Sequence, residues 1–345
     1  MNEMVDLSSK TVENYLTCFN KNGSPKNIEN IQWQFFNNGI KNFVSIEFDV
    51  ELNRTAAIYA TFSVPFKIGD KTVIGSQSLD TITDIDYRGK GLFITLAKDV
   101  YKKAVENEVV LVYGFPNGNS IHGFKKKLEW EVLDPVPFLI KPLKSRYFTK
   151  KISFLKLIPN INLSFSRYRK SKTYTIIEDF SFPDTVNPLW ASFSKQIKVA
   201  VQRDKNYLEW RYLKKPFETY KIAHCFDNKN THLGFIIYTI KSKHGGKIAY
   251  IMELIYDLQY PKVATQLMSY AITQIKKENA DCVLSWCLEH SPNYKAIKKT
   301  GFFTLPEKLR PIELHFGARC FKEALKPLVY NRKNWYLSYS DSDTV

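Results

Sequence analysis

The chain has 345 residues, of which 44 % are hydrophobic and 14 % aromatic, and it carries a formal net charge of +16 at pH 7. This apolar content excludes a disordered chain and is enough to bury sizeable cores. At about 150 residues per domain, the length predicts two domains. The positive charge favours an anionic partner, such as nucleic acid, a membrane surface or a small molecule that bears phosphate.

Cysteine usage and the N-terminal sequence indicate a protein of a reducing compartment. The five cysteines are odd in number and form no CxxC pair, so we expect no disulfide framework and no metal site. Residues 1–19 lack a cationic start followed by an apolar run, so no signal peptide is expected. No apolar stretch reaches about 18 residues, so we expect no membrane span and predict a cytoplasmic location.

The first half opens with helical patterns and continues with strands. Ser24-Pro25 has the form of an N-cap followed by a first-turn proline, which predicts a helix starting there. The run VVLVYGF is continuously apolar, as in a strand buried on both faces. In chain order we expect helices over 10–22 and 24–38, strands within 43–64 and over 76–83, a helix over 91–106, a buried strand over 109–115 and a basic amphipathic segment over 120–128.

The chain repeats part of its sequence. IQWQFFNNGI at 31–40 resembles LEWRYLKKPF at 208–217, and both contain a tryptophan that we expect in the core, Trp33 and Trp210. Later segments match in the same order and at nearly the same spacing, which predicts two structurally similar domains. The expected units are an N-terminal domain over 1–140, a basic connector over 141–172, a C-terminal domain over 173–330 and a tail over 331–345. Strands followed by helix, strand and helix predict an α/β (α+β) fold, with a mixed central sheet and flanking helices in each domain.

The segment DIDYRGKG, at 84–91, lies between a predicted strand and the start of a predicted helix. Backbone amides at a helix start have no intrahelical partner, and the helix dipole directs its positive end there. Gly89 and Gly91 allow a ligand to approach this backbone closely. The segment therefore predicts a binding site for a phosphate or pyrophosphate. It is neither a Walker A loop nor a dinucleotide fingerprint, because the spacing of both motifs fails.

The loop residues resemble a known motif. Arg88-Gly89-Lys90-Gly91 after a strand resembles the acyl-CoA loop, [RQ]-x-x-G-x-[GA], of GNAT-type N-acyltransferases, although Phe93 replaces the final Gly or Ala. The later KKKLEW resembles the end of that domain, with Glu129-Trp130 in place of Gly-Phe. The resemblance covers most of residues 1–140 and, more faintly, 173–320. It implies two tandem GNAT-like domains.

Only the first half has the loop. The corresponding stretch 255–267 contains no glycine, and Pro261 removes a backbone amide. Tandem halves with one active loop resemble bacterial nucleotide-sugar N-acyltransferases most closely. This resemblance implies acyl-CoA as cosubstrate, no covalently bound cofactor, and transfer of the acyl group to the amine of a nucleotide-linked amino sugar for surface polysaccharide biosynthesis.

Two alternatives remain at this point. The first is a peptidyl-type aminoacyltransferase that uses aminoacyl-tRNA, which the positive charge would suit. The loop argues against nucleic acid as a partner, because tRNA has no pyrophosphate for it to hold. The second is a non-catalytic binding protein in which the loop only caps a helix.

The resemblance also assigns residues to acyl-CoA. A backbone N–H of strand 76–83 would polarise the thioester carbonyl, the loop amides would hold the pyrophosphate, and Arg88 would add charge. The amine would attack directly, without a covalent enzyme intermediate. The expected cofactor-binding residues are Ile82, Thr83, Arg88, Gly89, Lys90, Gly91, Leu92, Asn117 and Asn119.

Three side chains are candidates for the base that deprotonates the amine. His122 follows the FPNGNS loop, Asp80 lies within an apolar strand, and Glu253 occupies the equivalent strand of the second half. The alternatives are a surface histidine and carboxylates that satisfy a turn or a strand edge. For the acceptor, basic residues in QRDKNYLEWRY could reach a diphosphate, or could form a solvated helix face. The expected acceptor-binding residues are Arg203, Lys205, Arg211, His290 and Asn293.

Overall fold

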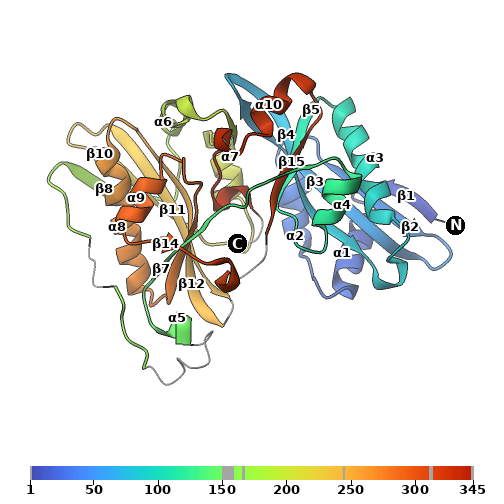
Figure 1. Cartoon of the computed structure of the whole chain (residues 1–345), viewed down its shortest axis with the longest axis horizontal. Coiled ribbons are helices and arrows are strands. Elements are labelled where there is room, and N and C mark those ends of the chain that lie inside the picture. Colours follow the sequence, from blue (N-terminus) through green and yellow to red (C-terminus); the bar gives the residue numbers. More distant parts are fainter. Residues whose placement is uncertain (1, 150–158, 165–167, 244, 311–313, 343–345) are drawn as a thin grey trace.

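The computed structural model describes residues 2–149, 159–164, 168–243, 245–310 and 314–342 (Figure 1). Parts of the predicted connector and the last three residues of the predicted tail lie outside this range. The described chain forms two mixed β-sheets with helices packed on them, which confirms the predicted fold class. None of its helices is both long enough and apolar enough to cross a membrane. The five cysteines all lie within the described residues, where they are buried and form no disulfide.

The first half contains the elements expected around residues 76–115. The predicted helix start at Ser24 is wrong, because α2 begins at Ile28 with Asn27 as N-cap and continues into the π-helical turn η1, Gln32–Phe36. The other elements are β1 (Asn2–Asp6), α1 (Val12–Lys21), α2 (Ile28–Ile31), β2 (Phe43–Asp49), β3 (Arg54–Ile68), β4 (Lys71–Thr83), η2 (Ile85–Tyr87), α3 (Leu92–Glu106), β5 (Val109–Gly114), α4 (Ile121–Lys127) and β6 (Glu131–Leu133).

The second half follows the same order of strands, helix, strand and helix. Its elements are β7 (Phe138–Pro142), α5 (Arg146–Thr149), β8 (Tyr174–Glu178), α6 (Val186–Phe193), β9 (Val199–Val201), α7 (Lys205–Leu208), β10 (Lys221–Asp227), β11 (His232–Lys243), β12 (Gly246–Tyr256), α8 (Pro261–Lys277), β13 (Cys282–Trp286), α9 (Tyr294–Lys299), β14 (Phe303–Thr304), β15 (Phe316–Cys320) and α10 (Lys326–Val329). A π-helical turn, η5 (Glu209–Leu213), lies between α7 and β10.

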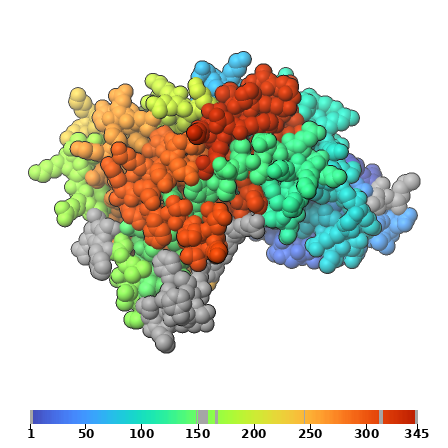
Figure 2. Space-filling view, viewed as in Figure 1, coloured from blue at the N-terminus to red at the C-terminus, as the bar shows by residue number. Residues whose placement is uncertain are grey.

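The two sheets exchange strands. The first has the order β1-β2-β3-β4-β5-β15-β6, with β9 paired to β3, and the second has the order β14-β7-β13-β12-β11-β10-β8. Strand β7 therefore belongs to the sheet of the second half, and β9 and β15 belong to the sheet of the first. This differs from the predicted division of the chain at residues 140 and 173. The C-terminal segments, red in Figure 2, pack between the two halves.

The repeated tryptophans contact each other. Trp33 lies on η1 and Trp210 on η5, and their rings stack with centroids 4.7 Å apart and an interplanar angle of 12°. Trp33 Nε1 donates to the Trp210 carbonyl at 2.8 Å, and Trp210 Nε1 donates to the Trp33 carbonyl at 3.1 Å. Both side chains are buried, as predicted. The reciprocal bonds place the two halves in matching orientations around this pair.

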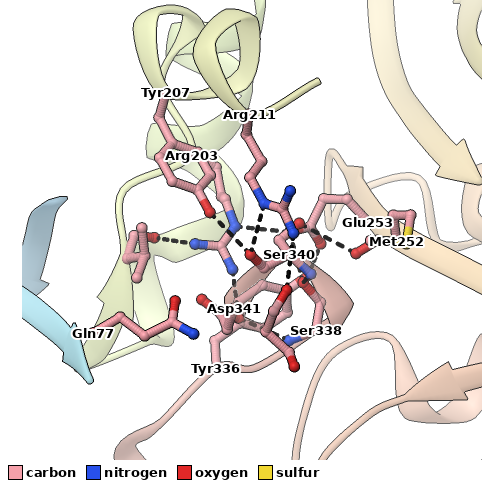
Figure 3. Close-up of polar contacts among 12 residues, drawn as sticks. Gln77, Arg203, Tyr207, Arg211, Met252, Glu253, Tyr336, Ser338, Ser340 and Asp341 are labelled. Atoms are coloured by element: carbon pink, nitrogen blue, oxygen red, sulfur yellow. Dashed lines mark hydrogen bonds and ion pairs between the residues drawn. The ribbon is translucent and has the colours of Figure 1, made fainter. Parts of the chain in front are cut away.

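A buried ionic network attaches the C-terminal tail to the second half (Figure 3). Arg203 donates from Nε to Glu253 of β12 at 2.7 Å and from Nη2 to Asp341 of the tail at 2.6 Å. All three side chains are inaccessible to solvent. Burial raises the pKa of the Asp341 carboxyl, and the charge of Arg203 opposes that rise. Tyr336 of the tail also donates to Glu253. If the tail left, Arg203 and Glu253 would therefore lose hydrogen-bond partners.

Replacing Arg203 with Met should strongly destabilise the protein, because it leaves the Glu253 and Asp341 carboxylates buried without a cation. The expected loss is about 3–5 kcal/mol of unfolding free energy. The loss should be larger at pH 8 than at pH 5, since unpaired carboxylates in the folded state bind protons more readily than in the unfolded chain. Urea unfolding at both pH values measures this.

Lys205→Met is the matched control. Lys205 pairs with Asp184 at the surface, so its removal should change stability little. An Arg203→Met protein as stable as the control would show that the network does not attach the tail.

Candidate functional site

Strands β4 and β5 separate at their carboxyl ends. They run parallel and pair as far as Ser78 and Gly114, after which β4 continues to Thr83 paired only with β3. A cavity of about 350 Å³ lies at this fork. It is lined by Phe19, Ser24, Lys26, Ser78, Leu79, Asp80, Thr81, Gly114, Phe115, Pro116, Asn117, Ser120, Phe124 and Trp130.

A bulge in β4 lies at the fork. Leu79 pairs with Ala60 and Ile82 pairs with Ile58, so two residues of β4 face one residue of β3. Asp80, within the bulge, has a φ of +46°, which is unusual for a residue other than glycine. Because a bulge interrupts the ladder, it places strand backbone where a ligand in the cavity can reach it. The bulge thus lies in the strand where the sequence predicted an interacting backbone N–H.

The carboxylate of Asp80 is held by two donors. Tyr15 donates its hydroxyl to Asp80 Oδ2 at 2.8 Å, and Lys26 Nζ forms an ion pair with Oδ1. The side chain of Asp80 is only 5 % exposed. Lys26 was not predicted as a site residue. The sequence carries no signal for it, because it precedes α2 and is distant in sequence from the glycine loop.

The glycine loop forms an open cradle at the start of α3. Gly89 has φ +79° and Gly91, the N-cap of α3, has φ +78°. A Cβ at either position would meet no atom within 4 Å, so the space in front of the backbone is open. No group among the described residues accepts a hydrogen bond from the amides of Gly89, Lys90, Gly91 or Leu92. Amides arranged in this way at a helix N-terminus can bind an anionic group such as a phosphate or a pyrophosphate.

Tyr87 anchors this loop from beneath. Its buried hydroxyl donates to Asp49 Oδ2 at 2.5 Å and accepts from Arg54 Nε at 3.1 Å. The hydrogen bond from Tyr87 lowers the pKa of the Asp49 carboxyl. The Lys90 ammonium lies 4.6 Å from the centre of the Tyr87 ring. The sequence analysis did not identify Tyr87, Asp49 or Arg54. The available signal was the position of Tyr87 between Asp86 and Arg88, directly before the glycines.

Of the other predicted cofactor-binding residues, one lines the fork cavity and the rest do not. Asn117 lines the fork cavity, where its Oδ1 accepts from the amides of Asn119 and Ser120 at 3.1 and 3.2 Å. Asn119 is exposed and does not line the fork cavity. Ile82 pairs with Ile58 and packs on the core, and Thr83 pairs with Ala57. Arg88 is exposed, with Nε 3.4 Å from the carbonyl of Thr83.

Two of the three candidate bases lie away from the cavity. His122 is exposed on α4, whereas Ser120 and Phe124 of the same segment line the fork. Glu253 is fully buried in the network with Arg203, so no substrate can reach it. Burial thus argues against Glu253 as the base, whereas His122 is exposed and is not part of the cavity lining. Of the three candidate bases, Asp80 is the one that lines the fork cavity.

The predicted acceptor residues do not converge. Arg203 is sealed in the ionic network, and Lys205 pairs with Asp184 at the surface. Asn293 is buried and donates to the Leu254 carbonyl at 2.8 Å. His290 is exposed, with Nε2 3.0 Å from the carbonyl of Trp335. These residues were predicted to line a cleft. Instead Arg203, Arg211, His290 and Asn293 contact the C-terminal tail.

Of the five predicted acceptor residues, Arg211 is the one that lines a second cavity, of about 210 Å³, between the two halves. It donates to the Ser340 carbonyl at 3.2 Å and to the Ser342 carbonyl at 2.8 Å. The cavity is also lined by Lys26 and Asp80, which are shared with the fork cavity, so the two spaces meet at that ion pair. Its remaining lining residues are Asn30, Ile31, Trp33, Gln34, Phe62, Gln77, Lys215, Glu218, Lys243, Ser340 and Ser342.

The sequence matches no described protein family and no curated protein. The structure, in contrast, is similar to N-myristoyltransferase of Saccharomyces cerevisiae with bound myristoyl-CoA: the TM-score is 0.60 at 10 % identity, covering 92 % of this chain and 82 % of that chain. A probable N-acyltransferase of unknown function from Enterococcus faecalis V583 gives a TM-score of 0.62 at 10 % identity, covering 95 % and 75 % of the two chains. A GCN5-related N-acetyltransferase from Anabaena variabilis gives 0.62 at 13 % identity, again covering 95 % and 75 %.

The chain has the tandem fold of GNAT-type N-acyltransferases. Each similarity covers at least 92 % of this chain and therefore spans both halves. In this GNAT-type fold, the glycine cradle and the fork cavity both lie at the carboxyl end of β4.

Replacing Gly114 with Ala should destabilise the fork. A Cβ there would lie 3.0 Å from the Ser78 carbonyl oxygen and 3.4 Å from the Trp130 ring, so β4 and β5 would have to move apart. Crowding of this kind lowers unfolding free energy by about 1–3 kcal/mol, which urea unfolding would measure. Wild-type stability in this variant would contradict the close approach of the two strands.

Proposed function

We propose that the protein is an acyl-CoA-dependent N-acyltransferase that transfers an acyl group to an amine by direct attack. The observation that carries the proposal is the open glycine cradle at the N-terminus of α3, next to a cavity between separated parallel strands. The similarity to solved N-acyltransferases supports it. Acceptor-free amides occur at any helix start, so the case against a mere helix cap rests on the open space in front of Gly89 and Gly91 and on the cavity at the end of the same strand.

The donor would bind along the first half. The amides of Gly89, Lys90, Gly91 and Leu92 would hold the diphosphate, with the cations of Arg88 and Lys90 beside it. The acyl group would enter the fork, where the bulge of β4 offers backbone to the carbonyl. Acyl-CoA supplies the activated carbonyl, and the protein supplies position and a polar backbone.

The acceptor would reach the fork from the cavity between the halves. Asp80, at the junction, is the residue that would take the proton from the attacking amine. Among the described residues, four cations, Lys26, Arg211, Lys215 and Lys243, line the cavity against two carboxylates, Asp80 and Glu218. This cationic excess supports an acceptor with an anionic group. We therefore retain a nucleotide-linked amino sugar, of the kind used for surface polysaccharide, as the proposed acceptor.

Gly89→Glu and Gly91→Glu should each weaken acyl-CoA binding strongly, because a carboxylate in the cradle repels the diphosphate. We expect affinity for acetyl-CoA to fall at least about tenfold, or about 1.4 kcal/mol, by isothermal titration calorimetry. Gly39→Glu is the matched control: Gly39 also has a positive φ, +74°, and a Cβ there meets no atom within 4 Å. Unchanged affinity in both loop variants would remove the cradle from donor binding.

Asp80→Asn should lower turnover while preserving acyl-CoA affinity, because the amide cannot accept a proton from the acceptor. The loss expected for removing a general base is about 10²–10⁴-fold. His122→Ala should keep full turnover, since its side chain lies outside the cavity. Release of free coenzyme A, with products identified by mass spectrometry over a panel of nucleotide-linked amino sugars, measures both variants. Equal turnover in both would exclude Asp80 as the base.

A further inference from the structure

The junction between the two cavities holds a primary amine of the protein itself. Lys26 and Asp80 line both cavities, and they are ion-paired to each other. Among the described residues that line the fork cavity, Lys26 is the one cation and Asp80 the one carboxylate. The amine of Lys26 thus lies next to Asp80, where the proposed function would place the acceptor amine.

The surroundings keep Lys26 at this place without burying it. Its ammonium lies 5.1 Å from the centre of the Phe19 ring, and its side chain remains 29 % exposed. Tyr15 gives Asp80 a second donor, so the carboxylate stays bound when Lys26 leaves or loses its charge. The lysine is therefore fixed by one ion pair beside the strands that would hold the thioester.

We propose that Lys26 is a site of self-acylation, in which acyl-CoA bound at the glycine cradle transfers its acyl group to Lys26 Nζ when no acceptor is present. The inference rests on the proposed function. Asp80 takes one proton from the ammonium, and the freed lone pair attacks the acyl carbon. The C–N bond forms as the C–S bond breaks. The thiolate leaves as coenzyme A and takes up the second proton, while the proton on Asp80 passes to solvent.

The modification limits itself to one acyl group per chain. The product is a neutral amide, which no longer pairs with Asp80 and places its acyl group at the junction of the cavities. An acceptor amine then finds this junction occupied. Self-acylation would therefore lower turnover with an added amine.

Mass spectrometry of the full-length protein tests this. The protein is incubated without acceptor with acetyl-CoA and, separately, with butyryl-CoA, and peptides are mapped for acyl-lysine. Lys103 is a matched internal control, because it is 31 % exposed and paired with Asp6 and Asp99 but lies far from the fork lining. We expect acylation of Lys26 to exceed that of Lys103 at least about tenfold, because position raises its effective concentration.

Two variants distinguish acylation by acyl-CoA bound at the cradle from non-enzymatic acylation of an exposed lysine. In Gly91→Glu, acylation of Lys26 should fall to the level of Lys103, and in Lys26→Arg the modified peptide should be absent. If calorimetry shows acetyl-CoA or butyryl-CoA binding but Lys26 is acylated no faster than Lys103, the inference is overturned and the proposed function stands. If neither acyl-CoA binds, the proposed function and the inference fall together.

Discussion

The guanidinium of Arg203 is the group on which the arrangement of the molecule depends. It joins β12 through Glu253, the tail through Asp341, and β9 through the carbonyl of Val201, which accepts from Nη1 at 2.9 Å. Since β9 pairs with β3, the same side chain links the second half and the tail to the first sheet. Buried ions of this kind are stable only when every partner is present, so the network specifies one position for the tail. That position forms one wall of the cavity between the halves.

The same tail explains why the two halves differ. In the second sheet, β12 and β13 also run parallel, and β12 has a bulge next to Glu253. Here the tail fills the space: Tyr339 stacks on Trp286, with centroids 4.6 Å apart and an interplanar angle of 25°. Helix α8 begins directly at Pro261 without a glycine loop. The second fork is therefore closed by the protein's own side chains, while the first is open.

Local sequence patterns predicted the local structure well. The strand, glycine loop and helix around residues 84–91 and the tryptophan repeat depend on backbone chemistry and burial within short segments, which the sequence displays directly. The strand exchange was not predictable in this way. Strand β15 pairs with β5, about 200 residues earlier in the chain, and the sequence of neither strand indicates which strand it pairs with. Arg203 has the local pattern of a solvated helix face; only the packed structure reveals that two carboxylates and the tail enclose it. Lys26 lies near Asp80 for the same non-local reason.

At corresponding positions of the two halves, a carboxylate pairs with a different cation. Asp80 and Glu253 lie at or next to corresponding bulges, yet Asp80 pairs with a lysine and Glu253 with an arginine. A guanidinium stays protonated at any physiological pH and binds through several donors at once, so Arg203 holds Glu253 permanently. A lysine is held by one flexible ammonium, which can give up a proton or move away. The cation at each bulge thus matches the state of each fork: the fork next to Arg203 is filled by the protein's own side chains, and the fork next to Lys26 contains a cavity.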